Sequence, residues 1–145
     1  MEYFDHTLAY EIAREEAFRT RSYLDNKGNW TIGVGHLLGK GPQYSNISWT
    51  PTQVMITFME DLNSAIYYAH RQFPVLDQLS PARQRVLVSM MLNMGPNRFA
   101  SFVNTTSAVN RFDYHTAYIE MLDSKWAKID VPERAQRLAD QWRIG

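Results

Sequence analysis

The sequence predicts a mainly α-helical α+β protein that contains one small β-hairpin. Three observations lead to this fold class. Apolar residues recur at spacings of three and four over most of the 145 residues, which is the helical period. Two short strand-like segments flank an Asn- and Gly-containing turn within residues 22–35. A helix-start signal at Thr50 begins a helical pattern that no helix-breaking residue interrupts before Pro74. A helix of roughly 20 residues would be about 30 Å long.

The N-terminal third is predicted to hold one helix and the hairpin. An aspartate can cap a helix over residues 5–15, in which apolar residues lie one turn apart. Strands over 22–25 and 29–35 flank the turn 26–28, because Asn and Gly adopt the positive φ angles that a tight turn needs. The segment 39–49 is rich in Gly, Pro, Ser and Asn, and it is predicted to be a loop.

The rest of the chain is predicted to be helical. Thr50 and Gln53 match a capping box, with proline at the first helical position, and they start the longest helix. A second helix begins after Ser80 and ends at Gly95. Its middle is apolar nearly all round, which is typical of a buried helix. Further short helices are expected to start near Asp113 and Pro132.

These elements divide one predicted domain, residues 1–145, into three parts. The small β-containing part covers residues 16–50, and a connecting helix covers 51–72. The helical part covers 73–145, and the N-terminal helix is expected to pack on it. A length of 145 residues is near the commonest size of a single domain and is enough to bury a core of its own.

The composition narrows the classes of function. The chain has no cysteine, which excludes disulfides, zinc–thiolate sites and a thiol nucleophile. Its formal net charge is zero, which argues against a general nucleic-acid binder. The N-terminus lacks the basic and apolar regions of a signal peptide, and no run approaches the roughly 20 apolar residues of a membrane span. We therefore expect a protein made and folded in the cytosol, without stable membrane insertion.

Side chains on the second strand of the hairpin are expected to alternate between two faces. One face carries Trp30, Ile32 and Val34. The other face carries Thr31, Gly33 and Gly35. Because the second face is bare apart from one hydroxyl group, a ligand backbone or a sugar ring could lie close to it. Glycines in a strand are equally typical of β-bulges, so both interpretations stay open.

Two carboxylates near the hairpin suggest glycosidic bond cleavage. Glu16 lies where the first helix should end, and Asp25 lies at the end of the first strand. Such cleavage needs one carboxyl group that donates a proton and one that stays ionised. The hydroxyl group of Thr31 could hold the attacking water. Acidic residues near hairpins are common surface features, however, and these residues alone do not distinguish Glu15 from Glu16.

The motif in this stretch resembles that of a known family. The spacing Glu16-x8-Asp25-x5-Thr31, within Y-x-D-x-x-G-x-x-T-I-G-x-G-H-L-L, is similar to the signature of the phage-type lysozyme (endolysin) family, in particular of the T-even bacteriophages. The segment LNMGPNRFASFVNTT and the C-terminal residues extend the resemblance over nearly the whole chain. It implies a two-lobed lysozyme-like fold, in which a long helix connects a small β-hairpin lobe to a helical lobe.

The resemblance also implies an activity. Members hydrolyse the β-1,4 bond between N-acetylmuramic acid and N-acetylglucosamine in peptidoglycan. Glu16 would be the general acid, Asp25 the ionised carboxylate and Thr31 the residue that holds water. Inversion would require the two carboxyl groups to lie roughly 6.5–9.5 Å apart. Lytic transglycosylase activity, an inactive peptidoglycan-binding or structural module, and a chitin-active glycosidase are the alternatives. No cofactor is expected.

Several further residues receive roles through the same resemblance. Residues expected to contact the substrate are Leu37, Leu92, Asn93, Phe102, Thr105, Glu120 and Arg134. Leu92 and Glu120 stand where T-even lysozymes have an aromatic residue and an amide, and the neutral net charge differs from their basic charge. His36 is expected to form a structural pair with Asp61. The histidines show no metal-ligand spacing, so no metal site is predicted.

The resemblance suggests a biological setting as well. The expected partner is the glycan strand of peptidoglycan, and the protein is expected to act as a monomer. Without an export signal, it would wait in the host cytoplasm until a separate holin opens the membrane. A lysin carried by the virion is the other setting that the sequence allows.

Overall fold

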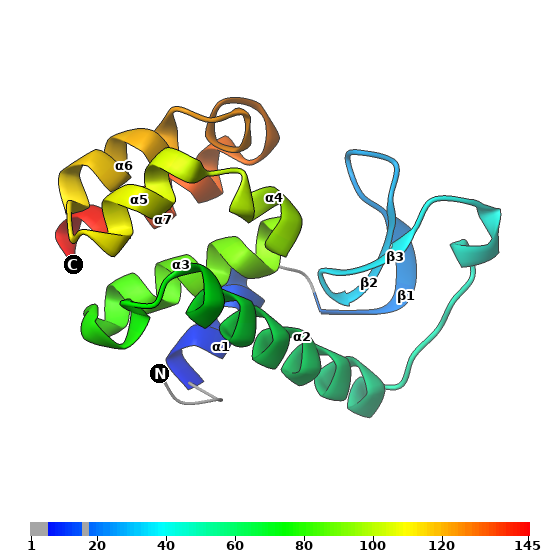
Figure 1. Ribbon diagram of the computed structural model, residues 1–145. Coiled ribbons are helices and arrows are strands. Elements are labelled where there is room, and N and C mark those ends of the chain that lie inside the picture. Colours follow the sequence, from blue (N-terminus) through cyan, green and yellow to red (C-terminus); the bar gives the residue numbers. More distant parts are fainter. Residues whose placement is uncertain (1–5, 16–17) are drawn as a thin grey trace. The chain divides into compact units, whose positions relative to one another are not determined.

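The computed structural model describes residues 6–15 and 18–145 and confirms the mainly helical α+β class. Most described residues are helical, and three short strands form one antiparallel sheet in the order β1-β2-β3 (Figure 1). The chain divides into two compact units. The first ends at Asn63 and the second begins at Ser64, so the boundary falls inside the longest helix, α2.

The first unit contains a short helix and the sheet. Helix α1 spans His6–Glu15, and Leu8 and Ile12 are buried one turn apart, as the apolar spacing predicts. The predicted capping aspartate, Asp5, lies outside the described residues. Helix α1 belongs to the same compact unit as the sheet, and its expected packing on the helical part stays a prediction.

The hairpin forms around the predicted turn. Strand β1 spans Phe18–Leu24, four residues longer at its start than predicted, and β2 spans Trp30–Val34. The Asp25 N–H donates to the Asn29 carbonyl oxygen at 2.8 Å, which closes the turn. Gly28 has a φ angle of 78°, which explains why glycine occupies this position.

The predicted loop over 39–49 is partly wrong, because both of its ends pair with the sheet. Strand β3 spans His36–Gly39 and pairs with β2. Strand β1 bulges between Arg19 and Tyr23, so the backbone groups inside the bulge need other partners. The segment 47–49 supplies them. Ser22 N donates to Ile47 O at 2.9 Å, and Trp49 N donates to Thr20 O at 2.8 Å.

The interpretation of Gly33 as room for a ligand is wrong. A Cβ atom at Gly33 would lie 3.4 Å from Val54 Cγ1 and 3.6 Å from the Trp49 ring, so protein side chains fill this space. Its φ angle of 69° also favours glycine. The alternative of an irregular backbone therefore explains Gly33, and the strand around it is buried on both faces.

Helix α2 spans Pro51–Gln72 and begins at the predicted capping box. Gln53 N donates to Thr50 Oγ1 at 3.2 Å, and Thr50 N donates to Gln53 Oε1 at 2.8 Å. The helix ends just before the predicted breaker, Pro74. Its buried side is the apolar stripe read from the sequence, namely Val54, Phe58, Leu62, Ala65, Ile66 and Ala69.

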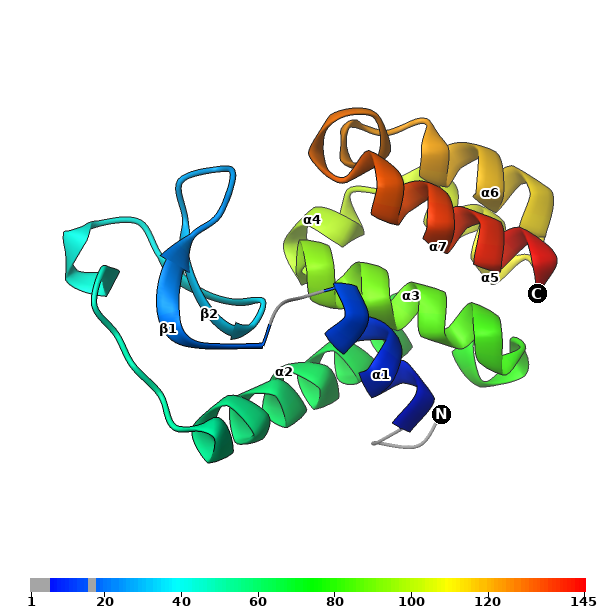
Figure 2. The same cartoon turned by 180° about the vertical axis from the view of Figure 1, so that it is seen from behind.

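The second unit is built from helices. Their bounds are Pro81–Met94 for α3, Pro96–Ala100 for α4, Val103–Asn110 for α5, Tyr114–Leu122 for α6 and Pro132–Ile144 for α7. A single π-helical turn, Trp126–Asp130, precedes α7. Helix α3 contains five fully or nearly fully buried residues, as expected, and it packs against α4 and α7. Helix α6 packs against both α5 and α7 (Figure 2).

Side-chain caps fix the starts of two of these helices. Ser80 Oγ accepts a hydrogen bond from Arg83 N at 3.2 Å, and Asp113 accepts one from Thr116 N at 3.1 Å. Both starts agree with the sequence, because Ser and Asp are preferred N-caps. Among the helices of the described part of the chain, none combines the length and the apolarity that crossing a bilayer requires.

The capping box gives a first testable prediction. Thr50→Ala should lower the free energy of unfolding by about 1 kcal/mol, because the Gln53 N–H loses its acceptor. Chemical denaturation measures this loss. Thr52→Ala is the matched control, since the exposed Thr52 side chain forms no hydrogen bond with any described residue. Equal unfolding free energies for the two variants would contradict the assignment.

Candidate active site

Asp25 is held by the turn between β1 and β2. Its Oδ1 atom accepts hydrogen bonds from the backbone N–H groups of Lys27 and Asn29, each at 2.8 Å. Its Oδ2 atom accepts a longer one from the Asn29 side-chain amide at 3.3 Å. The carboxylate therefore replaces backbone acceptors in the turn, which is the usual role of an aspartate at such a position.

These contacts favour the ionised form of Asp25. Partial burial acts to raise the pKa of Asp25, but the hydrogen bonds from Asn29 and Lys27 outweigh it. The positive charge of Lys27 acts in the same direction as the hydrogen bonds, so the pKa lies below the ordinary value of an aspartate. Asp25 thus favours its negatively charged form more strongly than an ordinary aspartate does.

Thr31 lies in the middle of the sheet. It is directly opposite Tyr23 of β1 and Leu37 of β3, and its side chain is 6% exposed. Its hydroxyl group lies 3.4 Å from the carbonyl oxygen of Asn29, a long hydrogen bond. Leu37 is 59% exposed. Of the predicted residues, Thr31 and Leu37 are therefore neighbours on one face.

Asn29 links the two predicted catalytic residues of the hairpin, a role the sequence interpretation missed. Its backbone N–H and side-chain amide donate to Asp25, and its carbonyl oxygen lies near the Thr31 hydroxyl group. The signal was present in the sequence, since an aspartate that begins a turn commonly accepts N–H groups from the residues that follow it. Glu16 lies outside the described residues, so its distance from Asp25 stays a prediction.

His36 and Asp61 are in contact. His36 Nδ1 donates to Asp61 Oδ2 at 2.6 Å, and the His36 ring lies 5.5 Å from the Trp49 ring, centroid to centroid. The hydrogen bond to Asp61 raises the pKa of His36 above its ordinary value, although partial burial opposes it. The pair joins the end of β2 and the start of β3 to α2, which is a structural role.

Two predicted substrate contacts of the second unit meet at one buried indole. Trp126 Nε1 donates to Asn93 Oδ1 at 2.7 Å, and the Phe102 ring lies edge-on to Trp126 at 6.4 Å. Because an indole N–H can only donate, it fixes which end of the Asn93 amide faces it. The Nδ2 donor of Asn93 is thus directed elsewhere, and Asn93 is partly exposed.

An ion pair supports the turn that carries Trp126. Arg98 of α4 bonds to Asp130, whose side chain is only 6% exposed, at the end of the π-helical turn. Within that turn, Val131 N donates to Trp126 O at 2.9 Å. The folded state is strongly destabilised when a buried carboxylate loses its cation. The ion pair with Arg98 therefore constrains the backbone of the turn that carries Trp126.

The remaining predicted contacts of the second unit are more dispersed. Leu92, Glu120 and Arg134 are partly buried, on α3, α6 and α7. Thr105 is 2% exposed, which leaves almost no surface for a ligand. The predicted roles of these four residues rest on the family resemblance.

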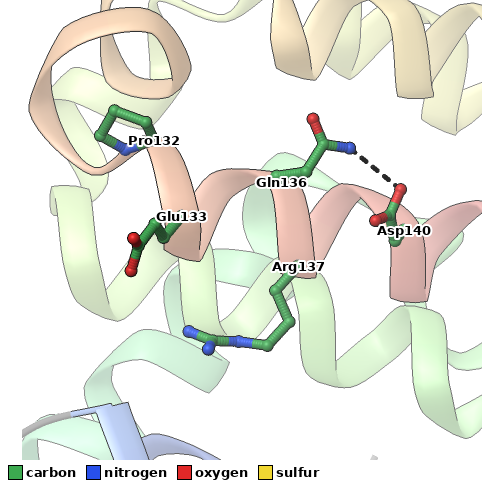
Figure 3. A pocket seen from close by; sticks show the side chains of 5 residues that line it. All are labelled: Pro132, Glu133, Gln136, Arg137 and Asp140. Carbon is green, nitrogen blue, oxygen red and sulfur yellow. Dashed lines mark hydrogen bonds between the residues drawn. The ribbon is translucent and has the colours of Figure 1, made fainter.

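A separate pocket of about 510 Å³ lies along α7. Figure 3 shows its lining residues, Pro132, Glu133, Gln136, Arg137 and Asp140. Gln136 Nε2 donates to Asp140 Oδ1 at 3.0 Å, which holds both side chains on this surface. Among the described residues, those predicted for the site do not line it. In the described ranges, no cluster of three or more His, Asp or Glu side chains could hold a metal ion.

The sequence of this chain is similar to those of known proteins. The family model described as phage lysozyme matches residues 13–139. The chain is 31% identical over 126 residues to the peptidoglycan hydrolase gp36 of Pseudomonas phage phiKMV. The matched region covers 87% of this chain and 14% of that protein.

Two further relatives are less similar. The chain is 27% identical over 142 residues to the pre-baseplate central spike protein Gp5 of Enterobacteria phage T4, covering 83% of this chain and 25% of that protein. It is 22% identical over 156 residues to the probable T4-type lysozyme 2 of Dictyostelium discoideum, covering 90% of each. The chain therefore spans a small part of the two phage relatives.

The His36–Asp61 pair gives a prediction of pH dependence. Because the pKa of His36 is raised in the folded state, the pair stabilises fully below the unfolded pKa of about 6.5 and loses this effect as pH rises through the folded pKa. Asp61→Asn should cost about 1 kcal/mol of unfolding free energy at about pH 5.5, discounted for partial exposure, and progressively less toward pH 9. Denaturation across this range measures it.

His70→Asn is the control for this experiment. Its Nε2 atom lies 3.9 Å from Asp77 Oδ1, beyond hydrogen-bond distance, so this variant replaces a histidine outside the His36–Asp61 pair. A loss in Asp61→Asn that stays constant from acid to alkaline pH would show that protonated His36 does not contribute.

Proposed function

This chain belongs to the phage lysozyme family, and from that premise we propose that it is a muramidase. Its substrate is the β-1,4 bond between N-acetylmuramic acid and N-acetylglucosamine in peptidoglycan. The reaction is hydrolysis by a pair of carboxyl groups in different protonation states. The similarity to a phage peptidoglycan hydrolase supports this substrate class.

The proposed mechanism begins with Glu16 as the general acid. It protonates the glycosidic oxygen as the bond to the sugar breaks, which leaves positive charge on the ring. Asp25 remains ionised and stabilises this charge. The observation that carries the proposal is the Asp25 carboxylate itself, whose pKa is lowered by the turn that holds it. A carboxylate fixed as an anion meets the requirement of the second group.

Water attack completes the proposed reaction. Thr31 and Asp25 position a water molecule on the face of the sugar opposite the leaving group, and Asn29 bonds to Asp25 and lies near the Thr31 hydroxyl group. Attack from that face inverts the anomeric configuration, and Asp25 acts as the base that accepts the proton lost by the water. The role of Thr31 as a donor to water fits its hydroxyl group, which has a weak intramolecular hydrogen bond at 3.4 Å.

Substrate contacts are proposed for both units. In the first unit, the exposed Leu37 side chain lies next to Thr31. In the second unit, Asn93 offers an amide donor whose orientation Trp126 fixes, and Phe102 packs on the same indole. Such a donor suits the acetamido and hydroxyl oxygens of the sugars. Leu92, Thr105, Glu120 and Arg134 are weaker candidates, assigned by resemblance alone.

Two biological settings fit a peptidoglycan hydrolase of this family. The first is an endolysin that acts as a monomer in host lysis and reaches the wall from the cytoplasm through a holin. The second is a lysin that forms part of the virion, which the similarity to a baseplate central spike protein favours. The time of synthesis during infection and the presence of the protein in purified virions distinguish them.

Lytic transglycosylase activity on the same bond is the alternative reaction. It requires one acid and no attacking water, so it leaves a 1,6-anhydro product instead of a reducing end. The anionic Asp25 beside Thr31 favours water attack. An inactive wall-binding module would give neither product.

The central test is digestion of purified peptidoglycan. We expect the wild-type chain to release reducing-end products, and Glu16→Gln to lower the rate by at least about 100-fold because no proton donor remains. Glu15→Gln is the matched control and should keep near-normal activity. Product analysis by mass spectrometry identifies the cleaved bond. Anhydro products would instead support the transglycosylase, and near-normal activity of Glu16→Gln would refute the assignment of the acid.

A further inference from the structure

Arg19 and Tyr23 extend the row of side chains that contains Thr31. The guanidinium carbon of Arg19 lies 5.2 Å from the centroid of the Tyr23 ring. Tyr23 is directly opposite Thr31, and Thr31 is directly opposite Leu37. Residues opposite one another in antiparallel strands share a face of the sheet. This face of the sheet therefore carries a row of side chains. The row runs from the exposed Leu37 across the nearly buried Thr31 to Tyr23 and the guanidinium group of Arg19.

The guanidinium group of Arg19 is available to a ligand. The Arg19 side chain is exposed, and none of the carboxylates in the described ranges forms an ion pair with it. Packing against an aromatic ring leaves the N–H groups of a guanidinium free in its plane. The ring of Tyr23 thus restricts the side chain of Arg19 without using its donors.

The surrounding segment is positively charged, although the whole chain is neutral. Residues 18–50 contain four basic residues, Arg19, Arg21, Lys27 and Lys40, and a single acidic residue, Asp25. The Asp25 carboxylate is already bonded to the turn. A locally positive surface next to a site attracts anions and raises their local concentration.

We infer that Arg19, supported by the Tyr23 ring, binds a carboxylate of the peptide stem of peptidoglycan. The inference rests on the proposed function and specifies its substrate. Muramic acid carries the stem on its lactyl group, so carboxylates of the stem extend sideways from the glycan strand. A guanidinium group can bind a carboxylate through two parallel hydrogen bonds, which a sugar without a carboxyl group cannot reproduce. Arg19 would therefore select stem-bearing glycan over bare glycan.

Arg21 provides a matched control. It lies on the same strand, is exposed and carries the same charge. Its Nη2 group, however, donates to Asn46 Oδ1 at 3.0 Å, and the residue pairs with Ser48 in the bulged part of β1. Its guanidinium group is thus bound toward the segment 46–49. Removal of Arg21 lowers the net charge equally but leaves the Arg19–Tyr23 pair intact.

The test is co-sedimentation of the full chain with purified sacculi that are free of teichoic acid. Arg19→Gln, Arg19→Lys and Arg21→Gln are compared in the Glu16→Gln background, which prevents digestion. Intact sacculi are compared with insoluble chitin, a bare β-1,4-linked N-acetylglucosamine glycan that carries neither lactyl groups nor stems. Arg19→Gln should bind intact sacculi about three- to fivefold more weakly and bare glycan nearly unchanged. Arg19→Lys should be intermediate, and Arg21→Gln should bind both as the parent does.

The outcomes separate this inference from the proposed function. Equal losses for Arg19→Gln and Arg21→Gln on intact sacculi would overturn the inference, because net charge alone would explain binding. An equal loss of Arg19→Gln on bare glycan would overturn it too, since the contact would be to sugar. Both results leave the muramidase proposal in place if the wild-type chain digests the wall. If the wild-type chain neither binds nor digests sacculi, both proposals fail. Thermal unfolding verifies that each variant is folded.

Discussion

The hydrogen bonds that the Asp25 carboxylate accepts from the turn organise the first unit. Two backbone N–H groups, from Lys27 and Asn29, converge on one oxygen atom and fix the path of the chain between β1 and β2. The same turn sets the register in which Thr31 faces Tyr23. That register in turn aligns Leu37 and the Arg19–Tyr23 pair with Thr31. One interaction thus stabilises the fold, keeps the carboxylate charged and arranges the face next to it.

The second unit uses a different device to orient a polar group. Trp126 is buried, and its indole donor holds the amide oxygen of Asn93. The indole is carried by a π-helical turn, a rare geometry that often occurs at functional sites. The ion pair between Arg98 and Asp130 closes that turn. The nearly buried carboxylate of Asp130 and the indole N–H of Trp126 thus constrain the side-chain amide of Asn93. A constrained amide suits a contact that must discriminate between ligands.

Local signals in the sequence predicted the local structure well. The capping box at Thr50, the serine cap at Ser80 and the glycine turn at Gly28 depend on residues within a few positions of one another. The non-local pairings were missed. Nothing near 47–49 indicates that it would pair with β1, because that pairing follows from a bulge in a strand over 20 residues away. Gly33 was misread for the same reason, since Trp49 and Val54 fill its space from later in the chain.

The candidate site was predicted in part. Asp25 and Thr31 come from the hairpin motif, and Asp61 was assigned to His36 by the family resemblance, a contact that the structure shows. Asn29 was overlooked because its bonds to Asp25 need the turn to be formed. Arg19 was overlooked because only the register of the sheet reveals which face it occupies.

The central claim is that the folded hairpin keeps Asp25 ionised as the second carboxylate of a glycosidase. The most direct test is an NMR titration of the ¹³C-labelled aspartate carboxyl groups, with Asp25→Asn to identify the resonance of Asp25. The account predicts a midpoint below the value of about 3.9 for an unperturbed aspartate. A midpoint at or above that value would show that burial outweighs the hydrogen bonds of the turn, and it would contradict the account.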